Sequence, residues 1–226
     1  MASDLENRFN SIIRVAMTTP LTQNGFRKRG RVFSRQLDGL AWLIEIQRSR
    51  HNSKEQTAFT VDCGIYVPGV MNLYIRIPAP TVPTTIDCCI RIGNEMLTEE
   101  SVNGWWTLYD PPHTVQEDAE ILNDLHKRVF NHVLPFLNEF PSTSEVAQYL
   151  ERPRANGEQR ITPGTYAMAL GCAGIIRLLR DERKAAIEAL SKAVQEASGS
   201  PGEQHLRLLE RHLLSVGPFG RLAKTW

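Results

Sequence analysis

The pattern of hydrophobic and polar positions changes its period along the chain. Before Pro20, apolar residues recur at helical spacing, which predicts a helix that ends before this proline, because proline cannot continue a helix. From residue 26 onward, apolar and polar residues alternate with a period of two, which is typical of strands. Strands are therefore expected at 26–36, 40–47 and 59–67, joined by short connections into an antiparallel meander.

The rest of the pattern adds two shorter strands and then turns helical. The short strands are expected at 86–92 and 105–109. Thr114 and Glu117 have the spacing of a capping box, which predicts the start of a long helix that bends or ends near Pro135.

These elements together predict an α+β fold. An antiparallel sheet of four or five strands, flanked by the N-terminal helix and the 114–137 helix, is expected in a domain at 1–150. Residues 151–162 are polar and lack a period, which is typical of a linker. Residues 163–226 follow as an add-on unit of three helices.

Composition and charge exclude several classes of protein. The 226 residues are 42% hydrophobic and 23% charged, which is ordinary for a globular protein. The net charge is +1, so no global field attracts nucleic acid or a membrane surface. No apolar run reaches the roughly 20 residues of a membrane span. The acidic start, with Asp4 and Glu6, differs from a secretory signal, so a cytoplasmic location is expected.

Cysteine and histidine spacing gives no sign of a metal or cofactor. The four cysteines include the neighbours Cys88 and Cys89 but no Cys-x-x-Cys pair, so we expect buried, reduced thiols. The six histidines show no metal-ligand spacing. The chain also lacks a phosphate-binding loop, a nucleophile elbow and a dinucleotide fingerprint, which makes a binding protein a better expectation than an enzyme.

Positive charge is concentrated between residues 26 and 54. This stretch holds eight lysines and arginines against two acids, a net charge of +6. On a single strand, alternate arginines share a face, and such a face fits phosphates or an acidic protein. The alternative is a solvated face that is balanced elsewhere in the molecule. The predicted basic face consists of Arg27, Arg29, Arg31, Arg35 and Arg48.

Negative charge is concentrated between residues 87 and 124, where nine acids face only Arg91. Acids at the start of a helix are favoured by its dipole, but a negative surface also fits a basic partner protein. Trp105 and Trp106 lie in this stretch, and neighbours on a strand point to opposite faces. One interpretation therefore puts one in the core and the other at an interface. The other interpretation, which we favour from the sequence, is that both are packed. The predicted contact residues are Glu99, Glu100, Trp105, Trp106 and Asp110.

A third group of polar residues lies on the predicted central strands. Glu45, Gln47 and Asp62 are expected near Arg31 on neighbouring strands. One interpretation makes Glu45 or Asp62 a general base, and the other is ordinary cross-strand ion pairing. The strand register, which the sequence leaves open, decides between them.

Several ordered blocks of the sequence resemble a known family. The blocks are 25–33 (GFRKRGRVF), 46–49 (IQRS), 59–61 (FTV), 64–66 (GIY), 105–106 (WW) and 134–137 (LPFL). Over about residues 3–150 they resemble the mostly bacterial family of domains of unknown function numbered four-three-zero-four. The resemblance implies no established activity, although some members are similar to toxin-neutralising immunity proteins in being small, cytosolic and variable at the C-terminus.

The C-terminal helices resemble one tetratricopeptide-type unit. Leu170 and Gly171, followed by Ala186 and Ala189, carry this likeness, although the spacing departs from the 34-residue repeat. A single unit of this type is expected to act as an add-on that presents a groove to a partner.

The function expected from the sequence is a non-catalytic, cytoplasmic, protein-binding module, of the immunity type with a toxin as its partner. Two alternatives stay open. A nucleic-acid-associated protein would use the predicted basic face. An enzyme would use Glu45 and Asp62 beside Arg31.

Overall fold

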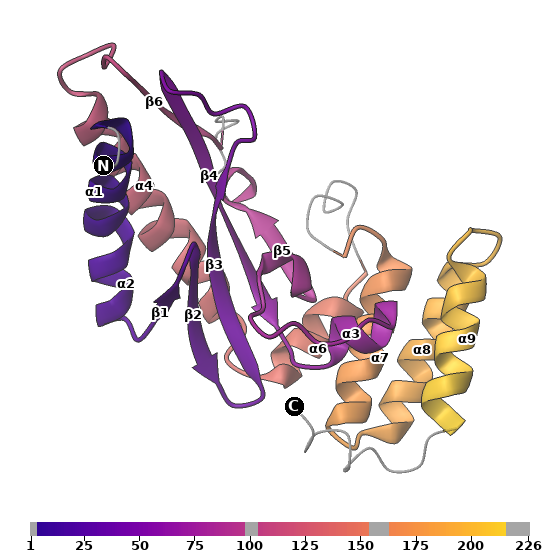
Figure 1. The fold of residues 1–226 in the computed structure, drawn as a ribbon. Coiled ribbons are helices and arrows are strands. Elements are labelled where there is room, and N and C mark those ends of the chain that lie inside the picture. The colour runs from indigo at the N-terminus through magenta and orange to yellow at the C-terminus, as the bar shows by residue number, and fades with distance from the viewer. Residues whose placement is uncertain (1–3, 98–103, 154–162, 216–226) are drawn as a thin grey trace. The chain divides into compact units, whose positions relative to one another are not determined.

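The structure is a computed structural model that describes residues 4–97, 104–153 and 163–215 (Figure 1). The chain forms two compact units, each assembled from separate stretches of sequence. The N-terminal unit consists of residues 4–36, 41–64, 92–97 and 104–139. The C-terminal unit consists of residues 37–40, 65–91, 140–153 and 163–215. The predicted linker lies largely outside the described residues, since 154–162 are not among them.

The α+β fold with an antiparallel sheet is confirmed. In the described part of the chain, six strands form one sheet in the order β1-β2-β3-β4-β5, and β6 pairs with β4. The strands are β1 (Arg27–Arg29), β2 (Val32–Leu37), β3 (Leu40–Arg48), β4 (Gln56–Tyr66), β5 (Ile90–Gly93) and β6 (Trp106–Tyr109). β1 pairs with β2, and β6 pairs with β4, each in the antiparallel direction.

The expectation of a single strand at 26–36 is wrong, because this stretch is a hairpin of β1 and β2. Arg29 pairs with Val32, which leaves Gly30 and Arg31 as a two-residue turn. Gly30 has φ +62, and Arg31 is not among the residues with positive φ. This combination is typical of the type II′ turn, in which glycine occupies the first central position. The sheet therefore has six strands rather than five.

Two helical segments pack against each other in the N-terminal unit (Figure 1). Each consists of an α-helix, a π-helical turn and a second short α-helix. The first segment is α1 (Asp4–Ile13), η1 (Arg14–Thr18) and α2 (Thr19–Gln23). The second segment is α4 (Glu117–Arg128), η4 (Val129–Val133) and α5 (Leu134–Asn138). In both, the second residue of the last helix is a proline.

The first helical segment does not end before Pro20, contrary to the sequence-based expectation. A proline inside a helix has no N–H for the carbonyl four residues earlier and its ring clashes with that carbonyl. Here the wider π turn precedes the proline, and Nδ1 of His126 donates to the carbonyl oxygen of Ala16 at 3.1 Å. The Ala16 carbonyl, which Pro20 cannot bond because it lacks an N–H, thus accepts a hydrogen bond from the neighbouring helix. The helix continues to Gln23.

A Schellman motif ends this segment and starts β1. The N–H of Phe26 bonds to the carbonyl of Leu21, and the N–H of Gly25 bonds to the carbonyl of Thr22, each at 3.0 Å. Gly25 has φ +81, a conformation that glycine adopts without strain. Phe26 and Leu21 are both buried, as this motif favours. The motif therefore fixes the direction in which the basic residues after Phe26 leave the helix.

The two helical segments run parallel, and one aromatic cluster joins them to the sheet. Arg8 contacts Asp118, and eight residues further along both helices Ala16 contacts His126. The sequence separation is 110 residues in both contacts, so the two helices run in the same direction. On the sheet side, the ring of Phe9 meets Phe59 edge-on at 5.1 Å, and Phe59 stacks on Trp106 at 5.5 Å. Such pairs add about 1 kcal/mol each beyond their buried area.

The C-terminal unit is helical. Its helices are α3 (Val70–Ile75), α6 (Thr143–Glu151), α7 (Tyr166–Leu179), α8 (Arg183–Glu196) and α9 (Glu203–Ser215), and it also contains the 3₁₀ turn η2 (Thr85–Asp87). A second 3₁₀ turn, η3 (Asn94–Met96), belongs to the N-terminal unit. A Cβ atom on Gly171 would lie 2.7 Å from the Tyr74 ring, and one on Gly174 would lie 2.6 Å from Leu190 Cγ. Glycine at both positions lets α3 and α8 approach α7 closely. None of the helices in the described ranges is long and apolar enough to cross a membrane.

The hydrogen bond from His126 to Ala16 predicts a measurable loss on substitution. In His126→Ala, the free energy of unfolding should fall by about 1 kcal/mol, because the Ala16 carbonyl loses its donor and Pro20 has no N–H to replace it. Urea unfolding followed by tryptophan fluorescence measures this change. The control is His132→Ala in η4, which should change stability by less than about 0.5 kcal/mol. Equal losses in the two variants would contradict the assignment.

Candidate functional site

The hairpin divides the predicted basic face. Paired residues share a face and neighbours alternate, so Arg27 and Arg29 point to one side while Lys28 points to the other with its partner Phe33. Lys28 Nζ lies 5.5 Å from the centroid of the Phe33 ring. Arg35, two residues beyond Phe33, lies on that same side, 5.0 Å over the Trp42 ring. The expectation that Arg35 shares a face with Arg27 and Arg29 is therefore wrong, because the turn at residues 30–31 reverses the chain.

Arg48 also lies away from the hairpin cations, in the contact between α1 and the sheet. Its Nη1 atom forms an ion pair with Glu6 at 2.9 Å, and its guanidinium lies 4.8 Å over the Phe9 ring. The structure therefore leaves Arg27, Lys28, Arg29 and Arg31 as one exposed group, which we call the basic hairpin. Within the described residues, no carboxylate forms an ion pair with any of these four side chains.

Ion pairs inside the N-terminal unit neutralise part of the acidic stretch, namely Glu117, Asp118 and Asp124. Arg8 Nη2 forms ion pairs with Glu117 at 3.1 Å and with Asp118 at 2.6 Å. The hydrogen bond with Asp118 raises the pKa of Arg8, so this guanidinium stays charged. Asp124 pairs with Arg128 at 2.9 Å. These acids therefore stabilise the start of α4 and its contact with α1, rather than forming a free negative surface.

The predicted capping box at Thr114 and Glu117 does not form. The helix begins at Glu117 itself, and no side chain caps it. The buried Glu117 carboxylate instead accepts hydrogen bonds from the backbone N–H groups of Tyr109, at 3.0 Å, and His113, at 2.9 Å. It therefore fixes the loop between β6 and α4. Asp110 in this loop is exposed, whereas Glu99 and Glu100 lie outside the described residues.

The two adjacent tryptophans divide between core and surface. Trp106 is 6% exposed and its Nε1 donates to Asp124 at 2.7 Å. Trp105 is 43% exposed at the residue before β6. The expectation favoured from the sequence, that both are packed, is wrong, because Trp105 stands before the strand and is exposed. Trp105 directly precedes β6, which pairs with β4.

A buried arginine holds the start of β6 in place, and the sequence analysis missed it. Arg128 is 7% exposed, lies 5.1 Å over the Trp106 ring and donates to Asn94 Oδ1 at 3.2 Å. Asn94 Nδ2 in turn donates to the carbonyl of Gly104 at 3.2 Å and to Thr60 Oγ1 at 2.9 Å. The available signal was the spacing of Asp124 and Arg128, one helical turn apart between buried apolar positions.

The third predicted group lies on neighbouring strands. Glu45 and Gln47 are half-buried on β3, and Asp62 is 8% exposed on β4, its neighbour in the sheet. Arg31 lies in the turn before β2, and its carbonyl accepts from the N–H of Ile46 at 3.0 Å. In the described ranges, no three His, Cys, Asp or Glu side chains are grouped to hold a metal ion. A catalytic role for these residues stays an untested prediction.

Comparison with known protein families gives one match. Residues 17–139, more than half of the 226 residues, match the family described as Domain of unknown function (DUF4304). The chain belongs to the DUF4304 family. The match includes the basic hairpin and both tryptophans, and it ends at the end of α5. No curated protein and no solved structure matches the chain.

The four cysteines of this DUF4304 protein are all buried thiols. Cys63 and Cys89 have no exposed surface. Burial raises the pKa of Cys89 to about 12 and raises the pKa of Cys63 as well, because a thiolate is poorly solvated in an apolar interior. Neutral buried thiols are poor nucleophiles and poor metal ligands.

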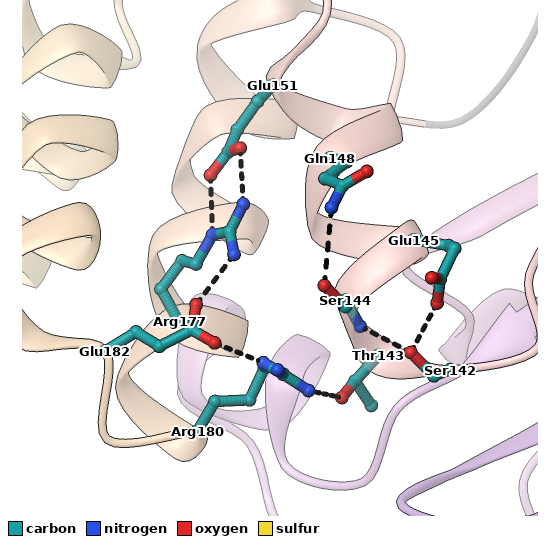
Figure 2. Close-up of polar contacts among 9 residues, drawn as sticks. All are labelled: Ser142, Thr143, Ser144, Glu145, Gln148, Glu151, Arg177, Arg180 and Glu182. Atoms are coloured by element: carbon teal, nitrogen blue, oxygen red, sulfur yellow. Dashed lines mark hydrogen bonds and ion pairs between the residues drawn. The ribbon is translucent and has the colours of Figure 1, made fainter.

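A polar cluster joins α6, α7 and the residue before α8 in the C-terminal unit (Figure 2). Arg177 donates two hydrogen bonds to the Glu151 carboxylate, at 2.9 and 2.8 Å, and a third to Glu182 at 2.6 Å. Arg180 joins Glu182, at 2.7 Å, to Thr143, at 3.0 Å. Because these donors and acceptors form hydrogen bonds with one another, we interpret the cluster as structural rather than as a binding site.

Thiol reactivity tests the state of the cysteines. The native DUF4304 protein should show no thiol that reacts rapidly with Ellman's reagent near pH 8, and the protein unfolded in guanidinium should show four. The positive control is Ser11→Cys on the exposed side of α1, which should add one rapidly reacting thiol. Rapid reaction of the unsubstituted native protein would contradict the burial.

The Arg177 cluster predicts a pH-dependent contribution to stability. Its hydrogen bond lowers the pKa of Glu182, so the contact stabilises the folded state above the unfolded pKa of about 4.3 and is lost as the pH decreases through the lower, folded-state pKa. In Arg177→Met, the free energy of unfolding at pH 7 should fall by about 1–2 kcal/mol, and the deficit should shrink below about pH 4.

Urea unfolding at a series of pH values measures this deficit. The control is Lys184→Met, which removes one exposed cation from the first turn of α8. It should change stability by less than about 0.5 kcal/mol at every pH. A deficit in Arg177→Met that does not depend on pH would show that lost packing, and not the ion pair, is responsible.

Proposed function

We propose that this protein is a non-catalytic protein-binding module whose N-terminal unit contacts the partner. The observation that carries the proposal is the exposed indole of Trp105, next to a neighbour that is packed in the core. Tryptophan is enriched in the residues that dominate binding energy at interfaces, because it buries a large rigid surface at low entropic cost. A large indole that faces solvent at a fixed position fits this role.

Other exposed groups lie at the opposite end of β6. Asp110, the residue after this strand, is exposed, and Val115 in the following loop is 98% exposed. Contact surfaces combine apolar and charged residues, so a partner that contacts both Trp105 and Asp110 spans the length of β6. The network of Arg128 and Asn94 fixes the backbone at Gly104, so Trp105 is held before binding and loses little freedom on binding.

We further propose an immunity-type role, in which the module covers a toxin inside a bacterial cell. Such a role needs a rigid complementary surface and no catalytic machinery. The four buried thiols favour a reducing compartment, since proteins that work in oxidising surroundings use cysteines in disulfides. The partner in this proposal is a protein that presents an apolar pocket for Trp105 and a basic group for Asp110.

Affinity capture from a lysate of the native host tests the proposal. The tagged protein should retain one stoichiometric protein, and nuclease treatment should not release it. The variant Trp105→Ala with Asp110→Lys should retain at least about tenfold less, because truncating a central aromatic residue costs about 2 kcal/mol. The control Val15→Ala with Glu139→Lys changes an exposed apolar residue and an exposed acid in the same unit, and it should retain the partner.

Other outcomes have definite meanings. Partners that disappear with nuclease would reject protein binding in favour of association with nucleic acid. A protein partner retained equally by both variants would reject the Trp105 surface as the contact. Thermal unfolding of both variants, with midpoints close to that of the unsubstituted protein, shows that a lost partner is not caused by a lost fold.

A further inference from the structure

The basic hairpin concentrates positive charge on one short strand and its turn. Arg27, Lys28, Arg29 and Arg31 lie within five residues, and all four side chains are exposed. Like charges this close destabilise a strand pair. Among the described residues, no acid of the fold offsets these charges with an ion pair.

Other arginines of the same unit are packed differently. Arg8 and Arg128 bind carboxylates, Arg48 binds Glu6 and covers the Phe9 ring, and Arg35 covers the Trp42 ring. The fold therefore offers carboxylates or rings to these four arginines. In the hairpin, Lys28 lies over the Phe33 ring, but none of the four cations has a carboxylate partner among the described residues. An anionic group outside the unit would complement them.

The backbone of β1 adds a second feature. This strand stands at the end of the strand order, so one of its edges faces away from β2. The residues that flank a two-residue turn exchange both backbone hydrogen bonds, and bonded pairs alternate with non-bonded pairs along an antiparallel ladder. Since Arg29 and Val32 flank the turn, the pair Lys28 and Phe33 is a non-bonded one. The N–H and carbonyl groups of Lys28 therefore point to the outer edge.

We propose that β1 binds an acidic, extended segment of a partner protein by strand addition. The partner's backbone pairs with the outward N–H and carbonyl groups of Lys28, and its Asp or Glu side chains bind the guanidinium groups of Arg27, Arg29 and Arg31. Arg27 and Arg29 share a face, so acids at alternate positions of the segment match them. This contact is independent of the Trp105 surface.

A peptide fits this edge better than a nucleic acid does. The two aromatic residues of the hairpin, Phe26 and Phe33, are 1% and 0% exposed, so they offer no platform on which bases could stack. The outward backbone groups of Lys28 match the donor and acceptor spacing of another strand. The competing interpretation is that the cations only prevent edge-to-edge aggregation, as lysine does on many edge strands.

A synthetic peptide, acetyl-Val-Glu-Thr-Glu-Val-amide, is the probe for this site. Titration into the ¹⁵N-labelled full chain at low ionic strength should shift the backbone amide resonances of Arg27 to Val32 in a saturable way. It should also slow hydrogen exchange at the Lys28 amide. The same peptide methylated at its interior amide nitrogens keeps the charge but cannot donate to a strand edge, so it should bind at least about tenfold more weakly.

Three variants separate charge from strand addition. Arg27→Gln with Arg29→Gln should weaken the peptide about tenfold, since two charge-assisted contacts are lost. Arg50→Gln with Lys54→Gln removes two exposed cations from another loop of the same unit and should weaken it less than about twofold, through the general field alone. Lys28→Pro removes the outward N–H, leaves the bonded pairs of β1 and β2 intact, and should abolish the shifts.

The contrary results are equally specific. No saturable shift at the hairpin would leave only edge protection and overturn the proposal. Equal binding of the methylated peptide would overturn strand addition. A short single-stranded or duplex DNA that shifts the same resonances more strongly than the peptide, and is insensitive to Lys28→Pro, would assign the hairpin to nucleic acid instead. All of these results leave the Trp105 surface untouched, because that surface is tested by a different capture and different variants.

Discussion

The parallel pairing of two helical segments is the constraint on which the N-terminal unit depends. Parallel helices place their positive N-terminal ends side by side, which is unfavourable unless negative charge is supplied there. Glu117 and Asp118 supply it at the start of α4, and Arg8 of α1 binds both. The same alignment brings His126 to the Ala16 carbonyl, so that a proline is accommodated within the first segment. The parallel packing of the two helices therefore both neutralises the acids at the start of α4 and provides a donor for the Ala16 carbonyl.

That arrangement also decides which charges remain for binding. In the helix pair, Glu117, Asp118 and Asp124 form ion pairs with arginines, which neutralises part of the negative charge between residues 87 and 124. The basic residues of the hairpin form no ion pair with an acid among the described residues. A chain with a net charge of +1 thus presents a basic edge, because these acids pair with Arg8 and Arg128 and, among the described residues, no acid pairs with the hairpin.

The two surfaces that we propose for binding follow from the same sheet. Trp105 precedes β6, where a buried arginine and asparagine fix the backbone. The basic hairpin forms β1, whose direction is set by the Schellman motif at Gly25. In the first case, buried groups fix the backbone directly before the exposed Trp105. In the second, a buried contact of Leu21 and Phe26 precedes a strand whose side chains are all exposed. Rigid support beneath an exposed side chain is what allows a binding surface to act without rearrangement.

The sequence by itself determined the α+β class, the strand and helix periods and the family resemblance, because each depends on local spacing or on neighbours along the chain. It left open whether one or both of the adjacent tryptophans are packed, which the tertiary fold decided. It did not determine the hairpin at Gly30, since a basic residue on each side of a glycine satisfies a continuous strand pattern equally well. It also did not determine that the helix continues through Pro20, or that Glu117 bonds the preceding loop instead of forming a capping box. Their outcomes depend on donors from His126, Tyr109 and His113, and on the charge of Arg8. Whether a charge is buried in packing or left for a partner is decided by which residues the tertiary fold brings within bonding distance, and no local pattern encodes that distance.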